Sequence, residues 1–260
     1  MQIELIGCTS SGKSTLTKGM VQASREQGIT TLTADDFVLK QIRLNWIKSH
    51  LLRTLLIHLV AFFACLVTWR KNIEFYQFAM RHLFHLPIAW LEKLYLFRNV
   101  LKKIGIFEII RFRDTNQQVI LVDEGVLQTA HNLFVHVSVH VKREQILTFA
   151  RLIPLPDVIV YMRQSESLLL ERVNKRGHKR IPNRSNGNVA RFIKQAIATF
   201  DTLVQDPVVE SRLLVVDSGQ TFSTTANYQD DPSYDLALNI VRNGLITGIT
   251  NTRFETVPSH

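Results

Sequence analysis

Five short runs of apolar or β-branched residues punctuate the chain, and longer segments with helical spacing separate them. The runs are residues 2–6, 29–34, 119–122, 158–162 and 213–216. Strands that are buried on both faces are continuously apolar, and parallel strands need long crossover connections. The pattern therefore predicts an α/β fold with a five-stranded parallel sheet flanked by helices.

Helical spacing fills most of the segments between these runs. A first helix is expected from Lys13 to about Gln27, ended by Gly28, and later ones at about 165–175 and 189–204. Residues 135–141 alternate as a strand would, but helix from about Val126 onward is favoured because a parallel sheet needs a crossover there. A last amphipathic helix is expected near Pro232.

Residues 40–113 interrupt the α/β pattern with a long, aromatic-rich stretch of helical texture. We expect an α-helical insert between the second and third strands. The predicted organisation is a core of residues 1–39 and 114–248, an insert of residues 40–113, and a flexible tail of residues 249–260.

Leu55–Trp69 in this insert is a nearly uncharged run of 15 residues. As a helix it would be about 22 Å long, short of the roughly 30 Å hydrocarbon core of a bilayer. A buried or partner-facing helix is the favoured interpretation. Peripheral membrane contact through residues 50–72 remains open, and a full membrane span is disfavoured.

Charge is distributed unevenly. The 260 residues carry a formal net charge of +9; residues 40–113 hold 13 Lys/Arg and three acids, a net +10, which leaves −1 for the rest. An anionic substrate, an anionic membrane surface or nucleic acid could each explain a basic insert. Nucleic acid is unlikely as the partner because no recognisable binding module is present.

Other residue types point to little specialised chemistry. Cys8 and Cys65 form no metal or redox motif, and the spaced histidine pairs His82/His85 and His136/His140 lack a third ligand. Met1 leads directly into an apolar run without a signal peptide, which favours a cytoplasmic location, with membrane association left open. The sequence does not indicate an oligomeric state.

The most specific motif lies between the first strand and the first helix. Residues 7–14, GCTSSGKS, match the phosphate-binding P-loop pattern GxxxxGK[ST] in full. The glycines let backbone N–H groups face phosphates, and the helix start adds its positive dipole end. Lys13 can reach the β- and γ-phosphates, and the Ser14 hydroxyl can ligate Mg²⁺.

Acidic residues follow two of the strands. Asp123 ends the third strand, as expected for the Mg²⁺-binding carboxylate of a P-loop protein, and Glu124 could polarise water or a substrate hydroxyl. Asp35 and Asp36 close the second strand, where ligands bind in open α/β sheets, and either could act as general base. The alternative for these acids is helix capping.

A basic run follows the fourth strand. It comprises Arg172, Lys175, Arg176, Lys179, Arg180 and Arg184. Arg172 and Arg176 share one helix face, while Gly177 and Pro182 predict a mobile loop. Phosphoryl transfer needs positive charge on the migrating group and a lid against water, although such a run could also be a solvated face.

These segments together resemble the P-loop kinases of the thymidylate kinase-like and nucleoside-monophosphate kinase-like group. The similarity covers residues 1–39 and 115–243 and is carried by GCTSSGKST (7–15), ADDF (34–37), VILVDEG (119–125), PDVIVYMRQSESLLLERVNKRG (156–177) and LLVVDSG (213–219). The resemblance implies that Arg172 and Arg176 contact ATP phosphates and that Asp217, Ser218 and Gly219 lie beside the adenine.

The resemblance has departures. Thymidylate kinases carry Asp-Arg-Tyr or Asp-Arg-His after the third strand, whereas this chain has Asp123-Glu124-Gly125. The ADDF segment also resembles uridine and pantothenate kinases, in which the acid acts as base. The nucleotide substrate is therefore not carried over with the family.

The sequence predicts an ATP-dependent phosphotransferase acting on a small-molecule acceptor, a nucleotide or another anionic metabolite, with ATP and Mg²⁺ as cofactors. The catalytic candidates are Lys13, Asp35, Asp36, Glu124, Arg172 and Arg176; those for ATP are Gly7, Thr9, Ser10, Ser11, Gly12, Lys13, Ser14, Thr15, Arg172 and Asp217; those for the metal are Ser14 and Asp123. The alternative is a regulatory P-loop NTPase whose insert binds a protein partner or membrane surface.

Overall fold

A five-stranded parallel sheet forms the centre of the computed structural model, which describes residues 1–113, 118–137, 141–176 and 186–217. The strands are β1 (Gln2–Ile6), β2 (Thr30–Thr33), β3 (Gln118–Val122), β4 (Val158–Arg163) and β5 (Leu213–Asp217), in the order β2-β3-β1-β4-β5. Both the predicted strands and the α/β class are confirmed.

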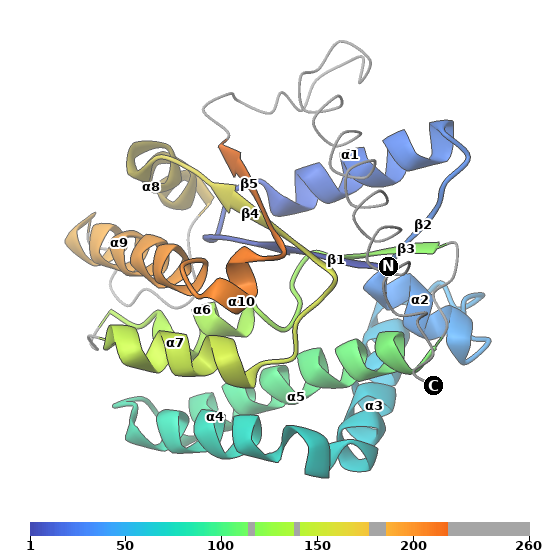
Figure 1. The fold of residues 1–260 in the computed structure, drawn as a ribbon, viewed down its shortest axis with the longest axis horizontal. Coiled ribbons are helices and arrows are strands. Elements are labelled where there is room, and N and C mark those ends of the chain that lie inside the picture. Colours follow the sequence, from blue (N-terminus) through green and yellow to red (C-terminus); the bar gives the residue numbers. More distant parts are fainter. Residues whose placement is uncertain (114–117, 138–140, 177–185, 218–260) are drawn as a thin grey trace, which may run out of the picture.

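Helices cover both faces of the sheet (Figure 1). They are α1 (Lys13–Glu26), α2 (Ala34–Gln41), α3 (His50–Val67), the short 3-10 helix η1 (Trp69–Asn72), α4 (Ile73–His85), α5 (Trp90–Phe112), α6 (Thr129–Phe134), α7 (Arg143–Leu152), α8 (Glu166–Arg176), α9 (Asn186–Leu203) and α10 (Pro207–Glu210). α1 lies on one face of the sheet. The helices α4, α5, α6, α7 and α9 lie on the opposite face.

Alternation along the strands assigns their side chains to the two faces. Ile3 and Leu5 of β1 pack against Leu16 and Met20 of α1. Ile6 faces the other way, into a larger core that α4 to α9 share. Because successive side chains of a strand point to opposite faces, Glu4 lies on that second face as well, where it is fully buried.

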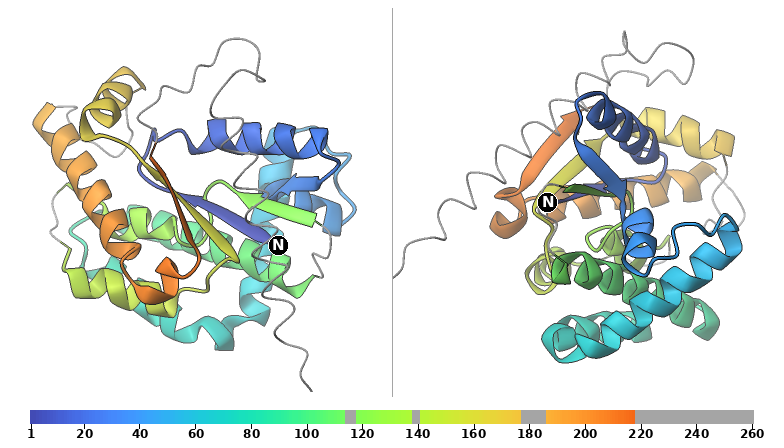
Figure 2. Two further views of the ribbon diagram at one scale, coloured as in Figure 1. Left: turned by 45° about the horizontal axis from the view of Figure 1, so that its top comes forward. Right: turned by 90° about the vertical axis from the view of Figure 1, so that its right-hand side faces the viewer.

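The insert predicted between the second and third strands is confirmed as the helices α3, α4 and α5. Figure 2 shows α3 along the outside of the molecule, with α5 between it and the sheet. The two helices pack backbone to backbone, since a Cβ atom on Gly105 of α5 would lie 2.0 Å from the Ala61 carbonyl oxygen of α3. Only a glycine at position 105 allows this close approach.

Three local expectations need correction. Asp35 and Asp36 do not end the second strand; they lie in the first turn of α2, because Thr33 caps that helix through its hydroxyl, which accepts from the Asp36 N–H. The helix expected from about Val126 begins only at Thr129 and ends at Phe134. α3 is not a buried helix, since only Ile57, Ala61 and Cys65 are buried, and the partner-facing interpretation of its apolar run stays a prediction.

Some expectations lie outside the described residues. These are the loop that follows Arg176, the helix expected near Pro232 and the tail of residues 249–260. The predicted domain boundaries stay predictions, although α2 runs across the boundary expected after residue 39.

Candidate functional site

Three segments that carry candidate site residues meet at the carboxyl edge of the sheet. β1, β3 and β2 are neighbours, and all strands are parallel, so the segments that follow them leave the sheet at the same edge. The P-loop follows β1, Asp123 and Glu124 follow β3, and the first turn of α2 follows β2. This edge is where open α/β sheets bind their ligands.

The P-loop curls around its own lysine. Gly12 takes φ 98°, in the left-handed region, and directly precedes α1. The Lys13 ammonium group donates to the carbonyl oxygens of Gly7 at 3.0 Å and Cys8 at 2.9 Å. Burial lowers the Lys13 pKa, and the Glu124 and Asp123 carboxylates oppose that effect. A bound phosphate would favour the charged lysine further.

Ser14 and Asp123 contact each other across the edge. The Ser14 hydroxyl donates to the Asp123 carboxylate, with 2.6 Å between Oγ and Oδ2. These residues are far apart in the sequence and are brought together by the pairing of β1 with β3. In P-loop proteins a hydroxyl and a carboxylate placed in this way hold Mg²⁺ together with the phosphates.

Polar atoms without a partner gather around the P-loop. Among the described residues, the buried side-chain atoms that make no hydrogen bond include Oγ of Ser10, Oγ of Ser11, Oδ1 of Asp123 and Oε1 of Gln164. Buried polar groups normally have hydrogen-bond partners, and leaving them unpaired is costly. An anionic ligand accompanied by a cation would supply donors and acceptors here, so the site fits Mg²⁺ and phosphate.

A buried network supports the P-loop from below. The Gln128 side chain clamps Gly7, accepting from its N–H at 3.1 Å and donating to its carbonyl at 3.0 Å. The Glu4 carboxylate in turn accepts from the Gln128 N–H at 3.0 Å. A Cβ atom on Gly125 would lie 2.4 Å from the Glu4 carboxyl group, so a larger residue at position 125 would push this carboxyl group aside. β1 thus fixes the segment that carries Asp123 and Glu124.

Burial raises the pKa of Glu4 to about 7, although backbone N–H groups of residues 126–128 and the charge of Lys103 favour the ionised form. The free-energy cost of desolvating this fully buried carboxylate is larger than the stabilisation that the N–H groups and Lys103 provide. Glu4 was not among the sequence candidates. A carboxylate within an otherwise apolar strand was the available signal.

α8 and the end of β4 approach the P-loop from the other side. The Arg172 guanidinium donates to the Ser10 carbonyl at 3.3 Å, and the Gln164 amide donates to the Ser11 carbonyl at 3.4 Å. Arg172 therefore reaches the loop, and its expected contact with ATP phosphates stays a prediction. Gln164 was missed by the sequence analysis. Arg176 is exposed at the end of α8, where the description of the chain breaks off.

Asp217 is held by a neighbouring strand. Arg163 at the end of β4 binds its carboxylate through two hydrogen bonds, of 2.7 Å and 3.1 Å. This contact lowers the pKa of Asp217, and both side chains are largely exposed. Ser218 and Gly219, the neighbours expected beside an adenine, lie outside the described residues.

The three acidic candidates for the general base differ in their hydrogen-bond and ion-pair partners. Asp36 accepts from the Thr33 hydroxyl at 2.7 Å and pairs with Arg53 of α3. Glu124 lies 3.7 Å from the Lys103 ammonium group of α5. Asp35 is exposed and has no hydrogen bond or ion pair with any residue that the structure describes. The insert therefore contributes two basic side chains, Arg53 and Lys103, that the sequence analysis did not single out.

Comparisons with known proteins give weak similarities. No protein-family model matches the chain, and no curated protein matches it either. Among solved structures, it is similar to deoxyadenosine kinase from M. mycoides with the products dCMP and dCDP bound, at 14% identity and a TM-score of 0.46, over 95% of this chain and 100% of that chain. It is also similar to shikimate kinase from Acinetobacter baumannii in complex with shikimate, at 13% identity and a TM-score of 0.37, over 94% and 93%. Similarities at this level do not indicate the activity or the substrate of this protein.

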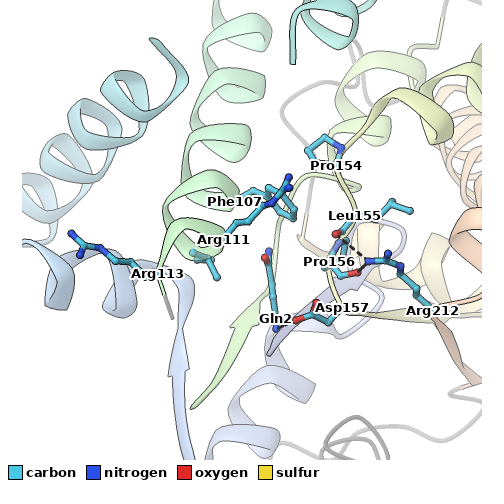
Figure 3. A pocket seen from close by; sticks show the side chains of 10 residues that line it. Gln2, Phe107, Arg111, Arg113, Pro154, Leu155, Pro156, Asp157 and Arg212 are labelled. Carbon is cyan, nitrogen blue, oxygen red and sulfur yellow. Dashed lines mark hydrogen bonds between the residues drawn. The ribbon is translucent and has the colours of Figure 1, made fainter. Parts of the chain in front are cut away.

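A separate cavity of about 550 Å³ lies at the opposite, amino edge of the sheet (Figure 3). Gln2, Asp157 and Arg212 line it from the starts of β1, β4 and β5. The Arg212 guanidinium donates to the Pro156 carbonyl at 2.8 Å, and Asp157 accepts from the Gln2 N–H at 2.7 Å. The length of a strand separates this cavity from the P-loop, so it is not part of the phosphate site.

Proposed function

We propose that the protein is an ATP-dependent phosphotransferase that acts on a small anionic acceptor. The observation that carries the proposal is the Ser14–Asp123 hydrogen bond beside buried polar atoms that have no partner. This arrangement suits a triphosphate with Mg²⁺, and it occurs at the edge of the sheet where an acceptor could approach from α2 and the insert.

On this proposal, the P-loop N–H groups and Lys13 hold the β- and γ-phosphates, and Arg172 adds positive charge from α8. Ser14 and Asp123 are the residues that would hold Mg²⁺, which neutralises phosphate charge when bound. Arg176 and Asp217 remain candidates for contacts with the phosphates and the adenine.

Asp35 is the favoured general base among the three acidic candidates. A base must be able to accept a hydrogen bond from the attacking hydroxyl. Asp36 is occupied by Thr33 and Arg53, and Glu124 has Lys103 beside it. The carboxylate of Asp35 has no such partner among the described residues and is exposed to an incoming acceptor.

The charge of the insert favours an anionic acceptor. Arg53 of α3 and Lys103 of α5 both reach the acidic segments at the carboxyl edge. A negatively charged group on the acceptor could bind these cations, while its hydroxyl approaches Asp35. A nucleotide or another anionic metabolite would satisfy this chemistry.

The test is ATP consumption measured against a panel of phosphorylated and carboxylated acceptors, with Lys13→Ala as the inactive control. Turnover that depends on one acceptor, and that is lost in Lys13→Ala, would support the proposal. Hydrolysis of ATP at the same rate with every acceptor and with none would contradict it.

That second result is the one expected of the alternative function, a regulatory NTPase whose insert binds a partner. The observation that favours this alternative is the exposed apolar side of α3, which a catalytic role does not require. Acceptor dependence separates the two functions because a regulatory NTPase transfers the phosphoryl group to water.

A further inference from the structure

The outer face of α3 is a continuous apolar surface. We define it as Leu51, Leu55, Leu59, Phe62, Phe63 and Leu66, whose spacing of mostly three or four residues places them on one side of the helix. Leu51 is 82% exposed, Leu55 65% and Phe63 57%. Scattered exposed leucines are normal, but six large apolar side chains along one helix form a patch that indicates an interaction site.

The opposite side of α3 is anchored to the protein. Ile57, Ala61 and Cys65 are buried, and Ala61 packs directly on Gly105 of α5. Both ends of the helix lead back to the core, through Phe37 and Val38 of α2 and Phe75 and Tyr76 of α4. α3 is long and apolar enough to cross a membrane. To cross a membrane, however, α3 would have to separate from α5. In the folded protein it lies along the protein surface.

The charged residues of α3 and of the segments that flank it in the sequence are all basic. Between Phe37 and Ile73 the chain has six Lys/Arg residues and no Asp or Glu. Lys48 is exposed before the start of α3, and Arg70 is exposed after its end. Lys71, the residue after Arg70, pairs with the buried Glu108 carboxylate at 3.3 Å. Trp46, which is 72% exposed, precedes Lys48 by two residues. Tryptophan and basic side chains at the ends of an apolar helix are typical of the interface between lipid and water.

We propose that the outer face of α3 docks on the surface of an anionic lipid bilayer, with the helix lying in the plane of the interface. The apolar side chains would enter the boundary of the acyl chains, and the basic residues at both helix ends would bind lipid phosphates. A second copy of this chain is a poorer occupant, because two-fold pairing would bring the same positive charges together. The proposal rests on α3 and does not depend on the proposed function.

The experiment is flotation of the full-length protein with vesicles of phosphatidylcholine alone or of phosphatidylcholine mixed with phosphatidylserine. Wild-type protein should float with the anionic vesicles, and high salt should weaken the binding because charge contributes to it. No flotation with anionic vesicles would overturn the proposal.

Two variants test the residues. Leu55→Glu/Phe63→Glu places charges on the outer face and should reduce binding to anionic vesicles by roughly tenfold or more. Val208→Glu is its control, since Val208 is an exposed apolar residue of α10. Unchanged binding by the double variant would overturn the proposal. Circular dichroism of each variant separates a lost interaction from a lost fold.

The charge contribution has its own matched pair. Lys48→Gln/Arg70→Gln should weaken binding to anionic vesicles several-fold, whereas Lys18→Gln/Arg25→Gln, on exposed positions of α1, should leave it unchanged. Equal losses in both pairs would show that only net charge matters and would contradict docking through α3. Light scattering without lipid tests the second copy: a wild-type dimer that Leu55→Glu/Phe63→Glu dissociates, without vesicle binding, would assign the face to self-association and overturn the proposal.

Discussion

Single residues at the carboxyl edge of the sheet differ in how firmly the fold holds them. Ser14 and Asp123 are in direct contact, and Arg172 reaches the Ser10 carbonyl. Asp35 and Arg176 have exposed side chains. The residues proposed to hold phosphate and metal are thus positioned by the fold itself, whereas those proposed to meet an acceptor or the migrating group leave room for it.

Asp123→Asn should reduce turnover by roughly 10²- to 10³-fold, the range observed when one charge-stabilising group is removed from a catalytic site. The amide keeps an oxygen near Ser14 but loses the charge that attracts Mg²⁺. The measurement is the ATP turnover rate as a function of Mg²⁺ concentration, which should require more Mg²⁺ to saturate. Glu210→Gln, on the short helix α10, is the control and should match wild type. Equal Mg²⁺ dependence in both variants would remove Asp123 from the metal site.

Glu4→Gln should stabilise the protein more at pH 8 than at pH 5. In the folded state the Glu4 pKa is raised to about 7 from its ordinary value of 4.5. The folded state therefore binds this proton more tightly, and the associated stability is fully present below about pH 4.5 and lost as the pH rises through 7. The shift corresponds to about 3 kcal/mol of unfolding free energy that the wild type loses at high pH. Glu4→Gln does not lose this stability because glutamine does not ionise.

The measurement is chemical denaturation of wild type and Glu4→Gln at several pH values. The difference in unfolding free energy between them should change in favour of Glu4→Gln by about 2–3 kcal/mol between pH 5 and pH 8. A pH-independent difference would mean that Glu4 is already ionised in the folded protein.

At the scale of elements, the contact between α3 and α5 decides how the insert is attached. Gly105→Ala should destabilise the protein by about 1–3 kcal/mol, because its Cβ atom would collide with the Ala61 backbone and force the helices apart. The unfolding midpoint in urea measures the loss. An unfolding midpoint equal to that of wild type would show that the two helices do not approach each other this closely.

Gly19→Ala is the matched control for that substitution. Gly19 is also inside a helix, and a Cβ atom there meets nothing within 4 Å. Alanine has the higher helix propensity, so this variant should be more stable than wild type by about 0.5–1 kcal/mol. The opposite signs of the two changes separate helix propensity from packing.

At the scale of the whole molecule, the insert and the core share one edge of the sheet. Arg53 of α3 pairs with Asp36 of α2, and Lys103 of α5 lies beside Glu124. The same insert carries its apolar face on the outside of the molecule (Figure 2). It therefore carries both the proposed docking face and charges at the proposed acceptor site.

Arg53→Gln should raise the KM for an anionic acceptor by roughly tenfold and leave the KM for ATP unchanged, since the loss of a hydrogen bond to a charged group costs about 1.5–3 kcal/mol. Steady-state kinetics with each substrate varied in turn provides the measurement. Arg43→Gln, at an exposed basic residue before α3, is the control. If both KM values rise together, Arg53 supports the fold of the site and does not bind the acceptor.

Much of the fold could be predicted from local patterns. Continuous apolar runs gave the strands because a strand buried on both faces needs apolar residues throughout, and the P-loop motif predicted the start of α1 at Lys13. Asp35 and Asp36 were misplaced because Thr33 could extend the strand or cap a helix, and the choice depends on the hydrogen bond to the Asp36 N–H. The apolar run in α3 did not tell whether it was buried, since that depends on which helix packs against it.

The sequence by itself determined the five strands, the insert and the phosphate-loop motif, because strand periodicity, helix spacing and a short motif are local properties of the chain, whereas the order of the strands came from the tertiary structure. Only the tertiary structure decided which distant residues meet: Glu4 with the segment after β3, Arg53 with Asp36, and Lys103 with Glu124. It also left the outer face of α3 without a covering element among the described residues. Burial and pairing across long sequence separations arise from packing, and no local pattern encodes them.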